Sequence, residues 1–462
     1  MTFEQFKDAC FRLALEKGCD NAEIYSVSGD SFSVNVLSEE LDRYSVAREN
    51  GLNLRVLFDG KNGYAYTELF EDPEFLVDRA IDNAKAIETT DVNPMQGACE
   101  YPEITPPENP IMELSESEKI GLAMRLERDT LAFDGRVNRM GHCSVSTGTT
   151  HTHICNTLGL NAESSDNFSY AVIGPILRQG EDENEAYAFR FGKDLLDCSS
   201  MIKESVDNAL MRFNARTVDS GEYRVLIRYD AAADLLQAFS GMFSADSVQK
   251  GLSLLAGKLG EQIAAENITI FDDPFEKDNP RAFDDEGVPS VMTTVVENGV
   301  LKSYLHNLKT ALKDGVASTS NAGRPGVAAP IGISATNFYI APGIKTYDQM
   351  IGLLDNGLII TELGGLHAGL NPVSGDFSLI ASGLLVQNGS ILRSVEQITC
   401  AGNFLELMKN IETVGSDLHM GLPGNGRFGS PSLLISKLIF SGNYFLIGGA
   451  ALRPPRCLSI LK

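Results

Sequence analysis

The sequence contains Leu52-Asn53-Leu54-Arg55-Val56-Leu57-Phe58, which is followed by Gly63-Tyr64-Ala65-Tyr66-Thr67. Both stretches are rich in the apolar and aromatic residues that favour strands. Between them lie the turn formers Asp59-Gly60 and Asn62-Gly63. We therefore predict a β-hairpin, and with it an N-terminal half that combines helices with an antiparallel sheet.

Helical spacing of apolar residues recurs along the chain. Phe3, Phe6, Cys10 and Leu13 predict a first helix, and Gly18 is suited to end it. We expect further helices over residues 74–87, 115–133, 196–216 and 231–243, and a long helix near 404–411. These segments alternate with strand-like segments, as in an α+β protein.

Strands are predicted where apolar residues alternate with polar ones. Phe32, Val34 and Val36 show this period, and residues 136–192 resemble several antiparallel strands. Beyond Ile268 the chain is rich in glycine and in short strand-like stretches, which predicts a β-dominated region. This region is expected to form a barrel-like or sandwich structure with a few helices.

Composition changes suggest two domains in the 462 residues. We place an N-terminal αβ domain over residues 1–217 and a C-terminal Gly-rich β domain over residues 218–442. Within the first domain, residues 88–114 hold five prolines with little periodicity and predict an irregular connection. Residues 443–462 carry Arg453, Arg456 and Lys462 without any acidic residue and form an atypical tail.

The formal net charge of −24 repels nucleic acid and anionic membrane surfaces. The sequence lacks a run of 18 apolar residues and a signal-peptide pattern at its start, so we expect a cytoplasmic protein without direct contact to nucleic acid or membrane. The eight cysteines are scattered and include no Cys-x-x-Cys pair. This spacing favours neither disulfides nor a zinc ribbon.

One strand carries candidate metal ligands. His151, His153 and Cys155 share one face of a predicted strand, and His142 lies a short distance upstream. Nitrogen and sulfur donors of this kind can hold zinc. A solvent-facing sheet with alternating polar residues gives the same pattern and is the preferred interpretation.

Acidic and glycine-rich motifs offer other candidates. Asp272-Asp273-Pro274 and Asp284-Asp285-Glu286 contain paired carboxylates that suit acid–base chemistry or calcium, although turn formation explains them as well. The glycines of residues 364–370 lack the Lys-Ser/Thr of a phosphate loop, and Ser374 and Ser430 lack a nucleophile-elbow sequence. The helix over residues 231–243 contains no histidine, and its apolar stripe suits core packing.

Several stretches together resemble the TldD/PmbA family, whose members are also described as modulators of DNA gyrase and as TldD/TldE peptidase subunits. The matching stretches include the following sequences, in chain order: Gly51-Leu52-Asn53-Leu54-Arg55-Val56, Gly257-Lys258-Leu259-Gly260-Glu261, Phe271-Asp272-Asp273-Pro274, Ser318-Thr319-Ser320-Asn321-Ala322-Gly323-Arg324 and Ser374-Gly375-Asp376-Phe377-Ser378. The resemblance extends from about residue 50 to about residue 442. The tail over residues 443–462 departs from it, as a lineage-specific extension or a coding artefact.

The resemblance implies a zinc site that this chain does not carry. TldD-like chains have His-Glu-x-x-x-His on the central helix, and those three positions fall on Leu236, Gln237 and Gly241. Leucine and glycine donate nothing to a metal, and glutamine is no general base for a zinc-bound water. The position of the third ligand, a cysteine, falls near residues 416–418, where the chain has none. The chain is therefore similar to the PmbA/TldE branch.

That branch implies a subunit that binds no cofactor itself and pairs with a TldD-like metallopeptidase chain holding the zinc. The complex is expected to degrade or process unfolded peptides, and a homodimer is an alternative assembly for the isolated chain. The matching motifs suggest Asn321, Arg324 and Asp376 as substrate-groove residues. Two alternatives stay open: a stand-alone metal-dependent hydrolase that uses the histidine cluster, and a non-enzymatic protein-binding regulator.

Overall fold

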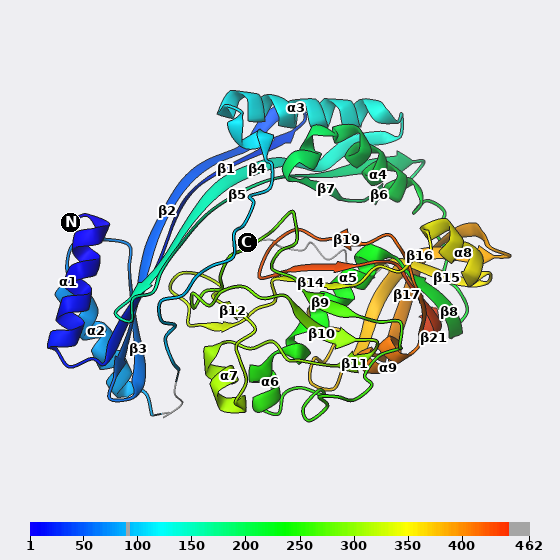
Figure 1. Cartoon of the computed structure of the whole chain (residues 1–462). Coiled ribbons are helices and arrows are strands. Elements are labelled where there is room, and N and C mark those ends of the chain that lie inside the picture. Colours follow the sequence, from blue (N-terminus) through cyan, green and yellow to red (C-terminus); the bar gives the residue numbers. More distant parts are fainter. Residues whose placement is uncertain (89–92, 443–462) are drawn as a thin grey trace, which may run out of the picture.

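A single long antiparallel sheet organises the N-terminal half of this computed structural model, which describes residues 1–88 and 93–442. Its strands are β1 (Asn21–Leu37), β2 (Glu40–Phe58), β3 (Lys61–Thr67), β4 (Val137–Asn156), β5 (Asn161–Gln179), β6 (Asp182–Glu185) and β7 (Ala188–Phe191). They are ordered β3-β2-β1-β4-β5-β6, with β7 also on β5. The sheet arches over the C-terminal half (Figure 1). Leu52 pairs with Thr67, which confirms the predicted hairpin.

Helices cover the two ends of this sheet and create two separate cores (Figure 1). They are α1 (Phe3–Glu16) and α2 (Pro73–Ala86) at one end, and α3 (Glu116–Phe133) and α4 (Cys198–Leu210) with the short 3₁₀ turns η1 (Pro110–Glu113) and η2 (Gly192–Leu196) at the other. Ser115 and Glu118 form a capping box that starts α3. Gly63 lets α2 approach β3, since a Cβ there would lie 1.9 Å from the Ala80 carbonyl oxygen.

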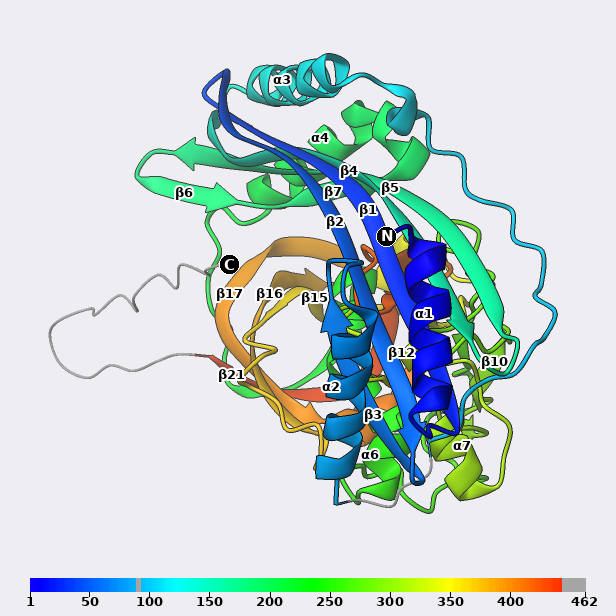
Figure 2. The same cartoon turned by 90° about the vertical axis from the view of Figure 1, so that its left-hand side faces the viewer.

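A closed barrel forms part of the C-terminal half. Its strands are β8 (Gly221–Ile227), β15 (Gly357–Gly364), β16 (Asp376–Gln387), β17 (Ser390–Asn403) and β21 (Leu433–Gly442), with β18 (Ile411–Val414) added to β21. Pairing of Ile398 with Gly442 joins β17 to β21 and closes the ring, which Figure 2 shows almost end-on. The predicted choice between barrel and sandwich is therefore settled for this sheet in favour of a barrel.

A second, mixed sheet and several short helices complete the C-terminal half. The sheet contains β11 (Val300–Leu301), β10 (Thr293–Glu297), β9 (Ile270–Asp272), β14 (Asn337–Ile340), β20 (Arg427–Ser430) and β19 (His419–Met420), and a separate ribbon pairs β12 (Ala322–Gly323) with β13 (Gly332–Ile333). The helices are α5 (Tyr229–Phe239), η3 (Ser240–Phe243), α6 (Ala245–Gln249), α7 (Leu308–Asp314), α8 (Tyr347–Leu354) and α9 (Phe404–Lys409).

Two helix predictions were wrong in extent. The segment near 404–411 is not a long helix, because α9 has six residues and Ile411 already begins β18. The segment 231–243 divides into α5 and the 3₁₀ turn η3. Within the described residues, no helix has both the length and the apolar character needed to cross a bilayer. The predicted domain boundary near residue 217 stays a prediction.

Candidate functional site

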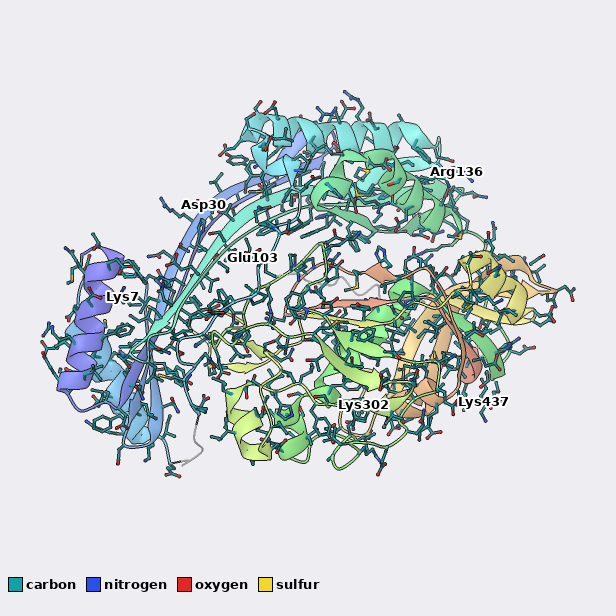
Figure 3. All side chains as sticks on the ribbon, in the orientation of Figure 1. Lys7, Asp30, Glu103, Arg136, Lys302 and Lys437 are labelled. Atoms are coloured by element: carbon teal, nitrogen blue, oxygen red, sulfur yellow. The ribbon has the colours of Figure 1, made fainter. Side chains whose placement is uncertain are left out.

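A cavity of about 890 Å³ lies between the arched sheet and the C-terminal half. Its walls come from Thr150, Ser165, Asp166, Asn167, Phe168, Tyr170 and Phe191 of the sheet, from Ser240, Gly241 and Ser244 at the end of α5, and from residues 278–281, 323–325, 332–336 and 422–426. Pro106 and Pro107 of the predicted connection also line it. Figure 3 shows Glu103 of that connection beside the arched strands. A volume of this size suits a ligand as large as a short peptide segment.

Of the three positions to which the resemblance assigns the missing zinc motif, Gly241 lines this cavity, whereas Leu236 and Gln237 are not among its lining residues. Leu236 is 1% exposed and belongs to the hydrophobic core of the C-terminal half. Gln237 is exposed on α5, and Gly241 lies in η3, where it lines the cavity. A Cβ added at Gly241 would meet nothing within 4 Å. The cavity therefore has open space at Gly241, the position to which the resemblance assigns the second histidine.

These residues do not fit a zinc ion. Among Leu236, Gln237 and Gly241 only the glutamine amide offers a donor atom, whereas a zinc site needs three or four nitrogen, sulfur or carboxylate ligands. The described residues contain no group of three or more His, Cys, Asp or Glu side chains arranged to hold a metal. In residues 416–418, where the resemblance places the third ligand, Asp417 accepts a hydrogen bond from Ser432 Oγ at 2.6 Å. This carboxylate therefore already has a structural partner.

The structure does not bring the histidine candidates together into one cluster. His142 pairs with Ser144 Oγ, whereas His151 contacts Ser165 Oγ further along the sheet. His153 contacts Asn161 and packs against Phe3. Cys155 is buried in the core under α1, where burial raises the pKa of its thiol to about 12. Each side chain therefore has local partners of its own.

Three carboxylates from the predicted acidic pairs accept hydrogen bonds from residues beside the cavity. Asp272 is 1% exposed and accepts hydrogen bonds from Asn321 Nδ2 at 2.6 Å and from the Thr336 N–H at 2.7 Å. Asp284 accepts the Ala322 N–H at 3.0 Å, and Asp285 accepts the Arg324 N–H at 2.7 Å. These bonds hold the cavity wall around residues 322–336, and those to the buried Asp272 and Asp284 are strong because the interior has a low dielectric constant.

Burial of the acidic cluster changes its titration. Burial raises the pKa of Asp284 to about 6. Burial, and then the nearby charge of Asp284, raises the pKa of Glu286 to about 8. Glu286 Oε2 accepts the Leu308 N–H at 2.8 Å, and Oε1 has no hydrogen-bond partner among the described residues. A proton on Glu286 relieves the repulsion between two buried anions.

The Arg324 side chain contacts strand β1 of the arched sheet. Its guanidinium lies 4.5 Å from the centre of the Tyr25 ring, and Nη2 lies 3.9 Å from Glu23 Oε1. Glu23 in turn lies 3.4 Å from Arg55 Nη1, and both of these side chains are 1% exposed. A buried set of charges therefore connects β1 and β2 with the C-terminal half.

The predicted groove residues occupy different environments. Asn321 is fully buried against Asp272, and Arg324 contributes to the cavity wall with a side chain that is 1% exposed. Asp376 is exposed, lies outside the cavity lining and is held by Ser374 Oγ at 2.8 Å and Asn403 Nδ2 at 2.9 Å. The sequence did not predict the residues of the arched sheet that form the opposite wall of the cavity. Their only signal in the sequence was the alternation of polar and apolar residues along a strand.

His419 was also missed, although it lies next to the helix of the lost motif. Its ring lies between Tyr229, at 5.1 Å, and Phe189, at 5.8 Å. Burial lowers the pKa of His419, so the neutral imidazole is favoured. This histidine connects α5 with β7 of the arched sheet through ring packing.

Comparison with known proteins gives consistent matches along the chain. Family models described as PmbA/TldA metallopeptidase domain 1, central domain and C-terminal domain match residues 22–84, 109–213 and 220–442. An uncharacterized protein of Methanocaldococcus jannaschii is 30% identical over 85% of this chain and 91% of its own length. Metalloprotease PmbA of Escherichia coli O157:H7 is 27% identical over 86% of this chain and 88% of its own.

Solved structures share the whole fold. A Thermotoga maritima protein described as a proposed modulator of a DNA gyrase is 35% identical, with a TM-score of 0.86 over 95% of this chain and 100% of that chain. TldE of Thermococcus kodakarensis has a TM-score of 0.85 over 95% of this chain and 100% of that chain. At 22% identity, the second likeness concerns the fold alone.

Proposed function

Because the chain belongs to the PmbA/TldA metallopeptidase family, we propose that it is the non-metallated, TldE-like subunit of a two-chain cytoplasmic peptidase. Its TldD-like partner supplies the zinc and the general base, and the complex degrades or processes unfolded peptides. The proposal is supported by the chemistry of Leu236, Gln237 and Gly241, the positions to which the resemblance assigns the catalytic motif, since they offer no zinc ligand set and Gly241 lines a large cavity.

The cavity supports a role in holding peptide without cutting it. Its walls combine aromatic side chains such as Phe168 and Tyr170 with backbone at residues 323–325 and glycine-rich backbone at residues 424–426. Exposed backbone groups and aromatic faces bind extended chains with little dependence on side-chain identity. The buried carboxylates Asp272 and Asp284 keep one wall in place, so the shape of the cavity is present before a ligand arrives.

The proposal is tested by purifying the full chain alone and after co-expression with a TldD-like chain that carries His-Glu-x-x-x-His. An unfolded peptide is the substrate, and zinc is measured by elemental analysis. We expect no stoichiometric zinc and no cleavage for the isolated chain, and chelator-sensitive cleavage for the pair. A pair whose partner has its motif glutamate replaced by glutamine is the matched control.

Two outcomes would contradict the proposal. Strong chelator-sensitive cleavage by the isolated chain would favour a stand-alone metal hydrolase. Recovery of gyrase and not of a TldD-like chain in a pull-down would favour a non-enzymatic regulator.

A further inference from the structure

Residues 102–108 of the proline-rich connection form a short strap between two fixed points. Before the strap, Tyr101 Oη donates a hydrogen bond to the Gly287 carbonyl oxygen at 2.9 Å. After the strap, Asn109 Oδ1 accepts a hydrogen bond from Ser169 Oγ at 2.6 Å. Gly287 belongs to the C-terminal half, whereas Ser169 belongs to β5 of the arched sheet. The strap therefore crosses from one half of the molecule to the other.

The strap is stiff and is held at its ends only. Pro102, Pro106 and Pro107 have restricted backbone angles, and the residues before them are kept out of the helical region. Residues 102–108 have no regular secondary structure and make no hydrogen bond with any other residue that the structure describes. Nothing along its length therefore ties the strap to the walls on either side.

A second cavity, of about 450 Å³, lies against the strap. Residues 103–108 line one side of it, and residues 191–194 with Phe275 and Lys277 line the others. The second cavity meets the larger cavity at the strap, since the two share six lining residues: Pro106, Pro107, Asn167, Phe191, Asp278 and Pro280. A ligand in the larger cavity thus has a continuous way onward past the strap.

An extended peptide fits this passage without a fixed register. Pro106 and Pro107 have no backbone N–H groups, so at these positions the strap offers no donors to a neighbouring strand. Side chains of both signs line the second cavity, among them Lys277 and Glu103, so a peptide of neither charge is excluded. Such a passage suits a chain that slides along its own direction.

We propose that a peptide held in the larger cavity continues under the strap into the second cavity, so that a substrate must thread a free end beneath residues 102–108. The strap is part of the chain and is anchored on both sides, which prevents entry from the side while the anchors hold. This inference rests on the proposed peptidase function. It adds a requirement for a free chain end, which the unfolded state of a substrate does not by itself impose.

The test uses the full chain co-expressed with its TldD-like partner and two forms of one unfolded peptide. The peptide has about twenty residues, enough to extend through both cavities. One form is linear, and the other is joined head to tail, so that it has the same peptide bonds but no end to thread. We expect the pair to cleave the linear form, and the cyclic form about tenfold more slowly or less.

Substitutions at the strap anchors test whether the strap causes this difference. Tyr101→Phe/Asn109→Ala removes the two anchoring hydrogen bonds and keeps the aromatic ring at position 101. Release of the strap is expected to bring cleavage of the cyclic peptide to within about threefold of the linear one. Thermal unfolding of the variant checks that the fold is retained.

A substitution in the second cavity tests the path itself. Lys277→Trp places a large side chain there, at a position whose side chain is 84% exposed, and is expected to slow cleavage of the linear peptide about tenfold. Lys302→Trp is the matched control, because Lys302 is exposed and lines neither cavity. It is expected to leave cleavage of both peptides unchanged.

The outcomes separate this inference from the proposed function. Equal cleavage of the cyclic and linear peptides by the unsubstituted pair would overturn the inference and leave the proposed function standing. So would a difference between the peptides that persists in Tyr101→Phe/Asn109→Ala, together with normal cleavage of the linear peptide by Lys277→Trp. A pair that cleaves neither peptide would contradict the proposed function, and this inference with it.

Discussion

Arg55 is predicted to hold the arched sheet, the proline-rich connection and the C-terminal half in one arrangement. Its guanidinium is 1% exposed, lies 3.4 Å from Glu23 and donates from Nε to Asn62 Oδ1 at 2.9 Å. Nη2 also donates to the carbonyl oxygens of Asn93 and Pro94, which belong to the connection. The Arg55→Met substitution keeps much of the buried volume and removes every one of these interactions.

The expected loss in the free energy of unfolding depends on the groups that Arg55→Met leaves without a partner. Removing one partner of a buried ion pair costs about 3–5 kcal/mol, because the remaining charge is uncompensated. Glu23 keeps a weaker contact with Arg324 at 3.9 Å and with Asn156 Nδ2 at 3.4 Å, which reduces this cost. The two carbonyl oxygens lose donors, at about 1 kcal/mol each. We therefore expect Arg55→Met to lower the free energy of unfolding by about 3–4 kcal/mol.

Urea unfolding followed by far-UV circular dichroism measures this change, and limited proteolysis reports whether the connection is released. Arg12→Met is the matched control, since the Arg12 side chain is 61% exposed and pairs only across one helical turn. Its effect is expected to stay below about 0.5 kcal/mol. A loss of less than about 1 kcal/mol for Arg55→Met, with an unchanged proteolytic pattern, would refute the reasoning.

Three other predictions concern single buried or open positions. Glu127→Ala is expected to cost about 2 kcal/mol in urea unfolding, because this fully buried carboxylate accepts both N–H groups of the turn at residues 38–39; a loss below 0.5 kcal/mol would contradict it. Leu236→His is expected to lower the free energy of unfolding by about 2–4 kcal/mol, because it buries a polar ring in the core. Gly241→His enters open space and is expected to leave the melting temperature nearly unchanged. Equal effects of the two substitutions would argue against the described cavity. The raised pKa values of Asp284 and Glu286 mean that the folded chain holds protons that the unfolded chain releases, so the free energy of unfolding is expected to fall as pH rises from about 4 to about 8. Glu286→Gln is expected to flatten this slope. An unchanged slope would count against a raised pKa for Glu286.

Local sequence signals predicted the elements that depend on nearby residues. The helix that begins after Ser115, the first helix and the hairpin after Leu52 each arise from contacts within a few residues, and the structure confirms them. The end of α9 was not predictable in the same way. Ile411 continues the helical spacing of Phe404 and Leu407, but its pairing with Ile435 of a distant strand draws it into β18.

The candidate site depended on contacts that no local pattern contains. The acidic pairs at residues 272–273 and 284–286 could be recognised in the sequence, but only the fold shows that Asp272 and Asp284 face backbone N–H groups. The cavity wall from the sheet also went unpredicted, since it requires the arch to cover the C-terminal half. By contrast, once the resemblance assigns the motif to Leu236 and Gly241, residue chemistry implies that neither position holds a ligand.

Closure of the barrel has a consequence for the order of events during synthesis. β8 is among the first strands of the C-terminal half to leave the ribosome, yet its partner β21 is more than two hundred residues further along the chain. Until β21 arrives, β8 and β17 each present an unpaired edge. Pairing across such a sequence separation is slow, and open edges attract other chains. We therefore expect the barrel strands to need chaperone protection from aggregation while the chain is still being synthesised.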